Sequence, residues 1–195
     1  VTHTLVDNAE QQIDLVAHGM RQQLTNDDRI AFPFGCNAEL AFDRYCSDGS
    51  FDYYDFRSDN ERRTSDALDL AVKGRAQLGG ITHSFNAGVL FTRYVARFGR
   101  QAFNLVGTGS IDGRSVVPPE PALTDENTNR KERSTELHLQ DMVPLGAQWS
   151  LWAGLRHTRI DRESARTDGS RATAYPQSFT TPWLAISHAF NAQTQ

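Results

Sequence analysis

Residues 65–94 read S-D-A-L-D-L-A-V-K-G-R-A-Q-L-G-G-I-T-H-S-F-N-A-G-V-L-F-T-R-Y. Apolar side chains occupy nearly every second position from Leu68 to Leu78, and charged or polar side chains fill most positions between them. Gly79-Gly80 follows, and the alternation resumes from Phe85 to Phe91. A period of two predicts strands with one apolar and one polar face, and the Gly-Gly pair predicts a tight turn. We therefore predict a β-hairpin.

The apolar face of this hairpin has to be covered, whereas its charged face has to stay in water. Removing an apolar side chain from water is worth about 1.5–3 kcal/mol, and an Arg or Lys in hydrocarbon costs roughly 2–4 kcal/mol. Either a second sheet or a lipid bilayer satisfies this requirement. The choice between them decides the class of protein.

Length and composition exclude several classes. The chain has 195 residues and a net charge of −4, with both signs mixed along it. Because there is no basic stripe, we predict no binding of nucleic acid. No apolar run approaches the ~20 residues of a membrane-spanning helix, which excludes a helical membrane protein. The chain starts at Val1 without a signal-like segment, and we expect it to be part of a longer protein.

Four further stretches alternate in the same way, giving about six predicted strands in all. They cover residues 8–20, 135–143, 149–160 and 179–190, and in the last of them both sets of positions are apolar, so its facing is left open. Between the strands we predict irregular segments over residues 21–63, 95–133 and 161–177. The connections therefore alternate between long and short.

Such alternation is typical of a transmembrane β-barrel with short periplasmic turns and long extracellular loops. Tyr94, Trp149 and Trp183 lie near strand ends, where interfacial aromatic belts occur. Six strands are too few to close a membrane barrel. The predicted fold is all-β: antiparallel strands of an incomplete transmembrane barrel. Two alternatives stay open, a soluble secreted β-sandwich that binds a ligand and an outer-membrane barrel enzyme.

The two cysteines, Cys36 and Cys46, lie close together in a stretch rich in Gly, Asp, Asn and Ser. We interpret them as a disulfide that closes a surface loop, which implies an oxidising compartment. Two free thiols in a cytosolic protein are the alternative.

Aromatic residues next to these cysteines are the candidate ligand contacts: Tyr45, Phe51, Tyr53, Tyr54 and Phe56. Aromatic side chains on a loop can stack on flat or amphipathic ligands. The alternative is that they pack the loop onto itself around the disulfide. On the polar face of the strands, the residues predicted to line a barrel lumen are Asp69, Lys73, Arg75, Gln77, Gln140 and Arg156.

No motif points to catalysis, a metal or a cofactor. Asp125, Asn127, Asn129 and Glu136 have calcium-loop spacing, but Arg130 replaces the required glycine. The six histidines have no zinc-type spacing, and there is no Gly-x-Ser-x-Gly elbow. We predict a protein that is not an enzyme.

The sequence resembles the TonB-dependent outer-membrane receptors, in particular those for ferric siderophores. The segments that carry the resemblance are Tyr54–Ser58, Asn60–Arg63, Gly79–His83, Leu137–Asp141, Trp149–Arg156 and Thr181–Ala185. The resemblance implies a barrel of about 22 strands, with a plug domain and a segment that engages TonB. Residues 1–195 would then be a partial barrel domain, with the plug and the other strands outside this chain. The implied partners are a ferric siderophore or similar ligand, TonB, the plug and lipid of the bacterial outer membrane.

Overall fold

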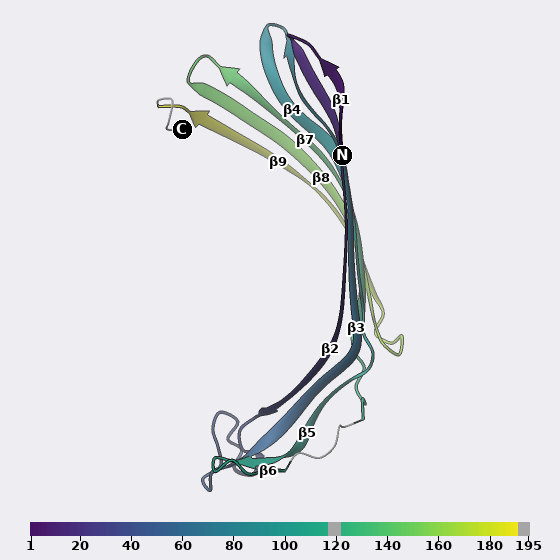
Figure 1. Cartoon of the computed structure of the whole chain (residues 1–195), viewed down its shortest axis with the longest axis vertical. Helices are drawn as coiled ribbons and strands as arrows, with labels where there is room; N and C mark the ends of the chain where they lie inside the picture. Colours follow the sequence, from purple (N-terminus) through teal and green to yellow (C-terminus); the bar gives the residue numbers. More distant parts are fainter. Residues whose placement is uncertain (117–121, 191–195) are drawn as a thin grey trace.

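The computed structural model describes residues 1–116 and 122–190, and its strands are hydrogen-bonded into one antiparallel sheet (Figure 1). Neighbouring strands follow the order β1-β2-β3-β4-β7-β8-β9, while β5 pairs with β3 and β6 pairs with β5. The strands are β1 (Thr2–Asp7), β2 (Gln11–Pro33), β3 (Ser50–Leu78), β4 (Ile81–Arg97), β5 (Gln101–Ser110), β6 (Ser115–Val116), β7 (Thr128–Leu145), β8 (Trp149–Arg166) and β9 (Thr173–His188). A single 3-10 turn, η1 (Asn37–Glu39), lies between β2 and β3.

The hairpin predicted from residues 65–94 is present as β3 and β4. Its turn is Gly79-Gly80, and both glycines have a positive φ, of 60° and 81°. Two left-handed residues in a row match the twist of the flanking strands, and glycine adopts this conformation without a steric penalty. The Gly-Gly pair therefore sets the register of the hairpin, which pairs Leu78 with Ile81.

The prediction of irregular structure over residues 21–63, 95–133 and 161–177 is wrong for most of these residues, which lie in strands. Strand β2 continues to Pro33 and β3 begins at Ser50, so residues 34–49 are the only break in the segment predicted to be irregular over 21–63. The second segment, predicted over 95–133, contains strand β5 and the first residues of β7. In the third segment, predicted over 161–177, only the six residues 167–172 connect β8 to β9, and the others belong to these strands. Outside the apolar band both faces of these strands are polar, as in Arg21-Gln22-Gln23, so the alternation that marks a half-buried strand is missing. Strand β1 was not predicted at all.

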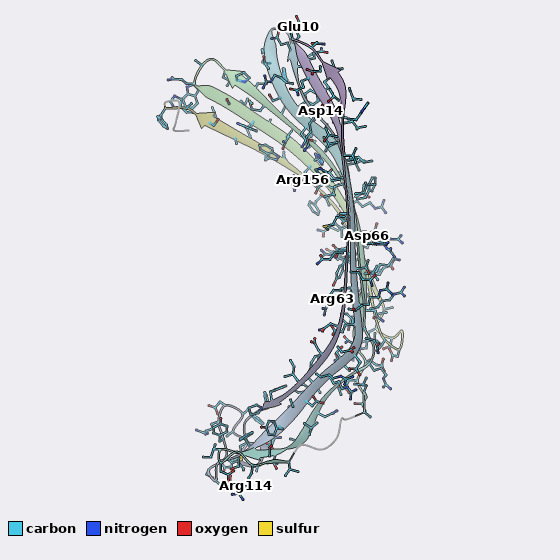
Figure 2. All side chains as sticks on the ribbon, in the orientation of Figure 1. Glu10, Asp14, Arg63, Asp66, Arg114 and Arg156 are labelled. Carbon is cyan, nitrogen blue, oxygen red and sulfur yellow. A yellow bond between two sulfur atoms is a disulfide. The ribbon has the colours of Figure 1, made fainter. Side chains whose placement is uncertain are left out.

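The register divides the side chains of the main sheet between two faces. Lys73, Asn86, Gln140 and Gly154 lie opposite one another in neighbouring strands and therefore share a face. Figure 2 shows Arg63 and Arg156, which belong to this face, toward the inner side of the curved sheet, and Asp66 toward the outer side. We call the two sides the concave and the convex face.

The convex face carries an apolar band. Its members are Ile13, Leu15, Leu68, Leu70, Val72, Leu78, Phe85, Val89, Phe91, Leu137, Leu139, Leu151, Leu155, Leu184 and Ile186. Along β3 the band runs from Leu78 to Leu68, about 34 Å of strand at ~3.4 Å per residue, which is about 24 Å of depth at a ~45° tilt. The apolar belt of outer-membrane barrels is about 25 Å tall.

No second layer covers this band in the described parts of the chain. All the larger sets of contacts between elements join strands that are neighbours in the sheet. Leu139 is 53% exposed and Leu184 is 72% exposed. A β-sandwich, the soluble alternative, would bury these side chains against a second sheet. The structure is an open, incomplete barrel wall. No helix within residues 1–116 and 122–190 is long and apolar enough to span a membrane.

Connections of different length lie at the two ends of the sheet. Residues 8–10, 79–80 and 146–148 form the short turns at one end. The connections at the other end are residues 34–49, 98–127 and 167–172. The distribution of long and short connections agrees with the prediction, although the last of the long loops is shorter than expected.

The structure also resolves the facing of β9 that the sequence left open. Trp183 pairs with Gly154 on the concave face, so Leu184 and Ile186 belong to the convex band. A Cβ on Gly154 would lie 2.3 Å from the indole nitrogen of Trp183, so the ring rests on glycine backbone. Tyr94 likewise lies on the concave face, and of the three predicted belt aromatics only Trp149 is convex. Trp149 contacts His188 at the short-turn end, with ring centroids 4.3 Å apart.

Candidate functional site

Strands β2, β3 and β5 continue beyond the rest of the sheet as an extension at the long-loop end. Residues 50–58 of β3 pair with β2 on one side and with β5 on the other. Figure 1 shows that the extension curves toward the same side as the opposite end of the sheet, so it overhangs the concave face. The predicted ligand contacts all lie on this extension or on the loop attached to it.

The structure divides the five predicted aromatic contacts between the two faces of the extension. Tyr53 and Tyr54 are adjacent in β3, so their side chains extend in opposite directions. Tyr54 and Phe56 share one face. Phe51 and Tyr53 share the other, where Tyr45 joins them with its ring centroid 5.2 Å from that of Phe51.

The face that carries Tyr54 bears a larger apolar surface than the sequence indicated. We define the aromatic platform as Ile30, Phe32, Tyr54, Phe56, Phe103 and Leu105, which the register places in two adjacent rows. The ring of Tyr54 lies 5.3 Å from that of Phe103, and Phe32 lies 6.1 Å from Phe103. Phe103 is 47% exposed and Leu105 is 53% exposed. Alternation along β2 places this platform on the same side as the concave face of the main sheet.

Phe51 and Tyr53 pack onto the extension instead. A Cβ on Gly109 would lie 2.5 Å from the Phe51 ring and 2.7 Å from the Tyr53 ring, so both rings cover bare backbone of β5. Their ring centroids are 5.1 Å apart. On this face the aromatic residues have a packing role, although they pack against β5 rather than around the disulfide.

A disulfide joins Cys36 and Cys46, with their Cα atoms 5.1 Å apart. Cys36 is fully buried, and its backbone pairs with that of Ala41 to close the loop. The next residue, Asn37, fixes the loop to the platform: its backbone N–H donates to Asp52 at 2.7 Å, and its side-chain amide donates to the Tyr54 hydroxyl at 3.1 Å. The cross-linked loop thus holds one edge of the platform in place.

An ion-paired bulge joins the extension to the main sheet. The register of β2 and β3 shifts between Asn26 and Asp28, and Asn60 on the bulged strand has a φ of +59°. Hydrogen bonds from the Arg57 guanidinium, and to a smaller extent those from Arg29, hold the pKa of the Asp59 carboxyl below its ordinary value of 3.8. The distances from Asp59 are 3.0 Å to Arg57 and 3.2 Å to Arg29.

The residues predicted to line the lumen share the concave face. These residues are Asp69, Lys73, Arg75, Gln77, Gln140 and Arg156. Arg156 pairs with Glu136 at 3.2 Å. Asp69 and Asn86 each have one shielded side-chain oxygen without a hydrogen-bond partner among the described residues. They line a polar hollow of about 270 Å³ together with His138 and Trp183.

The residues with calcium-loop spacing do not converge. The Asn127 amide donates to the Ser58 hydroxyl at 3.2 Å, the Asn129 side chain accepts from the Phe98 N–H at 2.8 Å, and Glu136 pairs with Arg156. The sulfurs of Cys36 and Cys46 and a carboxylate oxygen of Glu39 lie within 4.8 Å of one another, but the two sulfurs are bonded to each other and offer no thiolate. These groups form no metal centre.

Sequence reasoning missed Ile30, Phe32, Phe103 and Leu105, four of the six platform residues. Strand β5 was not predicted, so nothing in the sequence placed Phe103 next to Tyr54. The alternation of Ile30 and Phe32 with Arg29 and Ala31 is a signal that could have extended β2 to this point.

Comparison with known proteins gives a consistent result. A family model described as TonB dependent receptor-like, beta-barrel, matches residues 5–195. No curated protein matches the chain. The structure is similar to that of the ferric preacinetobactin receptor BauA from Acinetobacter baumannii, with a TM-score of 0.62, 15% identity, and coverage of 92% of this chain and 26% of that one.

It is also similar to the siderophore receptor PiuA from the same organism, with a TM-score of 0.52, 15% identity, and coverage of 95% and 28% of the two chains. The chain therefore spans about a quarter of the length of these receptors. Proteins of the matching family lie in the bacterial outer membrane. The chain belongs to the family of TonB-dependent receptor-like β-barrels.

Proposed function

We propose that this chain is part of the barrel wall of a receptor that takes up a ferric siderophore or a similar compound, with TonB supplying the energy. Family membership supports a receptor and transport role rather than an enzymatic one. The two similar structures are those of siderophore receptors. In this proposal the concave face lines the lumen, and its charged side chains meet a plug domain.

The aromatic platform is the observation that carries the proposal. It is an exposed apolar surface at the long-loop end, on the side of the extension that continues the concave face. In a bilayer this end lies outside the apolar band, where water-borne ligands arrive. Exposed aromatic patches of this kind mark binding sites, and rings spaced 5–6 Å apart offer stacking surfaces for a flat or amphipathic ligand.

Substitution of the platform in the full receptor that contains this chain tests the proposal. We expect the double variant Tyr54→Ala/Phe103→Ala to weaken ferric siderophore binding by about 10-fold or more, because each lost stacking contact is worth about 0.5–1.5 kcal/mol in addition to its buried area. Binding is measured by quenching of intrinsic fluorescence across a panel of ferric siderophores, and uptake by radioactive iron in iron-limited cells.

The matched control is Tyr53→Ala, which removes the neighbouring ring from the opposite face. We expect it to leave ligand affinity within about 2-fold of the wild type. Equal losses in Tyr53→Ala and in the platform variant would mean that the aromatic residues act only through packing. Uptake that persists in cells lacking TonB would contradict the energised mechanism.

A further inference from the structure

An ionisable pair interrupts the apolar band on the convex face. Asp141 lies in β7 between two apolar convex neighbours, Leu139 and Val143, and His83 of β4 faces the same side. Nδ1 of His83 lies 2.5 Å from Oδ2 of Asp141. The two side chains are 27% and 33% exposed. Both ionisable groups are therefore surrounded by side chains that meet hydrocarbon.

The pair lies well inside the band. Asp141 is four residues from the end of β7 at Leu145, which is about 14 Å along the strand at ~3.4 Å per residue, or about 10 Å of depth at a ~45° tilt. Leu145 is itself apolar and 47% exposed, so the band continues past the pair to the short turn. The acyl chains that surround the pair at this depth offer neither a hydrogen-bond donor nor an acceptor.

Hydrocarbon favours a pair without net charge, because an isolated carboxylate is far more costly there than a neutral group. A neutral pair shares one proton between Nδ1 of His83 and Oδ2 of Asp141. Whichever atom holds this proton, Nε2 of His83 keeps an N–H of its own. Oδ1 of Asp141 is shielded and has no hydrogen-bond partner among the residues that the structure describes. The pair thus presents one spare donor and one spare acceptor.

A hollow of about 470 Å³ lies beside the pair on the convex face. Besides His83 and Asp141, it is lined by Leu78, Phe85, Leu139, Ala153, Gly154 and Leu155. The walls of the hollow are therefore apolar. An occupant that fits has to combine an apolar side chain with one hydrogen-bond acceptor and one donor.

A second copy of the receptor meets this requirement, because it carries the same spare donor and acceptor. Receptors with their long loops outside all have one orientation in the membrane, so two copies that meet through their convex faces are related by a twofold axis along the membrane normal. His83 and Asp141 are hydrogen-bonded to each other and so lie at nearly the same depth. Across the axis, Nε2–H of His83 in each copy donates to Oδ1 of Asp141 in the other.

We propose that two receptors associate in the membrane through this surface, with reciprocal hydrogen bonds between His83 and Asp141 and with apolar side chains in the hollow. Apolar surface alone does not drive association in lipid, whereas polar side chains that pair between membrane-spanning segments do. The aromatic platform lies on the opposite side of the sheet. Siderophore binding and receptor association are therefore tested independently.

The test uses the full receptor that contains this chain, reconstituted in vesicles of phosphatidylcholine, whose headgroup has no N–H donor. Association is measured by Förster transfer between labelled copies as the receptor is diluted with lipid. We expect His83→Leu/Asp141→Leu to weaken association by about 10-fold or more, because the reciprocal hydrogen bonds are lost. Circular dichroism confirms folding, which should be preserved because both partners are replaced together by apolar side chains. Unchanged association, or a wild type that is monomeric at every dilution, would overturn the proposal.

The matched control is His157→Leu/Thr180→Val, which removes a second histidine from the same face. His157 and Thr180 lie in the row of Leu137, and Nδ1 of His157 is 2.8 Å from Oγ1 of Thr180. This pair contains no carboxylate, so it has no spare carboxylate oxygen to offer. We expect the control to leave association within about 2-fold of the wild type. Equal losses in the two double variants would show that any polar group on this face drives association, and would overturn the site.

Cross-linking locates the contact between the copies. Ala153 pairs with Asp141 across β7 and β8, and we expect Ala153→Cys to cross-link two copies through a short bis-maleimide. Gln140→Cys, on the concave face, should not cross-link. Equal yields for the two variants would contradict the assignment. Loss of the dimer in vesicles that contain phosphatidylethanolamine would assign the spare acceptor to a lipid ammonium group and overturn the proposal.

Discussion

Asp59 shows how a single residue can hold two parts of a sheet together. It follows Ser58, the last β3 residue paired with β5, and precedes Asn60, whose left-handed backbone forms the bulge. Its carboxylate bridges Arg29 of β2 and Arg57 of β3 while its side chain is only 13% exposed. The bulge would otherwise leave the ladder weakened where the extension begins, because the extra residue is unpaired there.

The lowered pKa of Asp59 predicts a dependence of the extension on acid pH. A carboxyl with a depressed folded-state pKa stabilises the fold above its ordinary value of 3.8, and this stabilisation is lost as the pH falls through the folded-state value. We expect amides of residues 50–58 in the full receptor to lose protection from hydrogen exchange between pH 5 and pH 2. The Asp59→Asn variant should lose less over the same range.

Asp43→Asn is the matched control for this measurement. The Asp43 side chain is 86% exposed, and its carboxylate lies 4.0 Å from the Arg44 guanidinium. An exposed ion pair of this kind contributes little to the stability of the fold. This variant should keep the full acid sensitivity of the wild type. If Asp59→Asn kept it as well, other carboxylates in the extension would be responsible, among them Asp48, whose pKa is lowered by the Ser50 hydroxyl.

At the scale of the elements, the alternation of apolar and polar side chains predicts a strand wherever one face of the sheet carries the apolar band. It located the hairpin from Ser65 to Tyr94 and parts of β7 and β8. It failed from Arg21 to Pro33 and from Asp161 to Arg166, because water contacts both faces there and polar residues are tolerated on each. It located most of β9 but left its facing open, because Trp183 is apolar and yet lies on the concave face, where it covers Gly154.

The candidate site was predictable only in part, for the same physical reason. Tyr54 and Phe56 were identified as aromatic residues near the cysteines. Tyr54 and Phe56 lie on the opposite face from Phe51 and Tyr53 because residues 50–58 form a strand. Phe103 joins the platform because β5 pairs with β3, two strands that are far apart in the sequence. Local patterns do not specify such pairings.

Two adjacent residues of β7 provide a test of the predicted lipid contact. Leu139 lies on the convex face in the middle of the apolar band, and Gln140 lies on the concave face. In the full receptor we expect Leu139→Arg to lower the free energy of unfolding from lipid vesicles by about 2–4 kcal/mol. Gln140→Arg, the matched control, should change it by less than about 1 kcal/mol. Equal effects of the two variants would contradict a lipid-facing convex surface.

At the scale of the whole molecule, the described residues form one sheet layer whose main path ends in two unpaired edge strands, and no second layer encloses a core between them. Strand β1 forms one edge and β9 forms the other. Among the described residues, the largest side chains that are fully buried are those of Cys36 and Ser58, both of which are small. An open sheet with exposed apolar side chains pairs readily with other chains.

We therefore expect the 195-residue chain alone, refolded in buffer without detergent, to form aggregates or edge-paired oligomers. Analytical ultracentrifugation and thermal unfolding measure this directly, with the full receptor in detergent as the control. A monomeric species with a cooperative transition would contradict the expectation. It would also mean that the convex band is covered in a way that the sheet does not show.

Strand β3 runs without interruption from the turn at Gly79 to the tip of the extension at Ser50. The same backbone therefore belongs to the main sheet at the short-turn end and to the surface that carries Tyr54 at the other end. A displacement of the tip would therefore be transmitted along one continuous strand into the main sheet, and it would bend that strand most easily at Asn60, where the backbone is left-handed and the pairing with β2 is irregular.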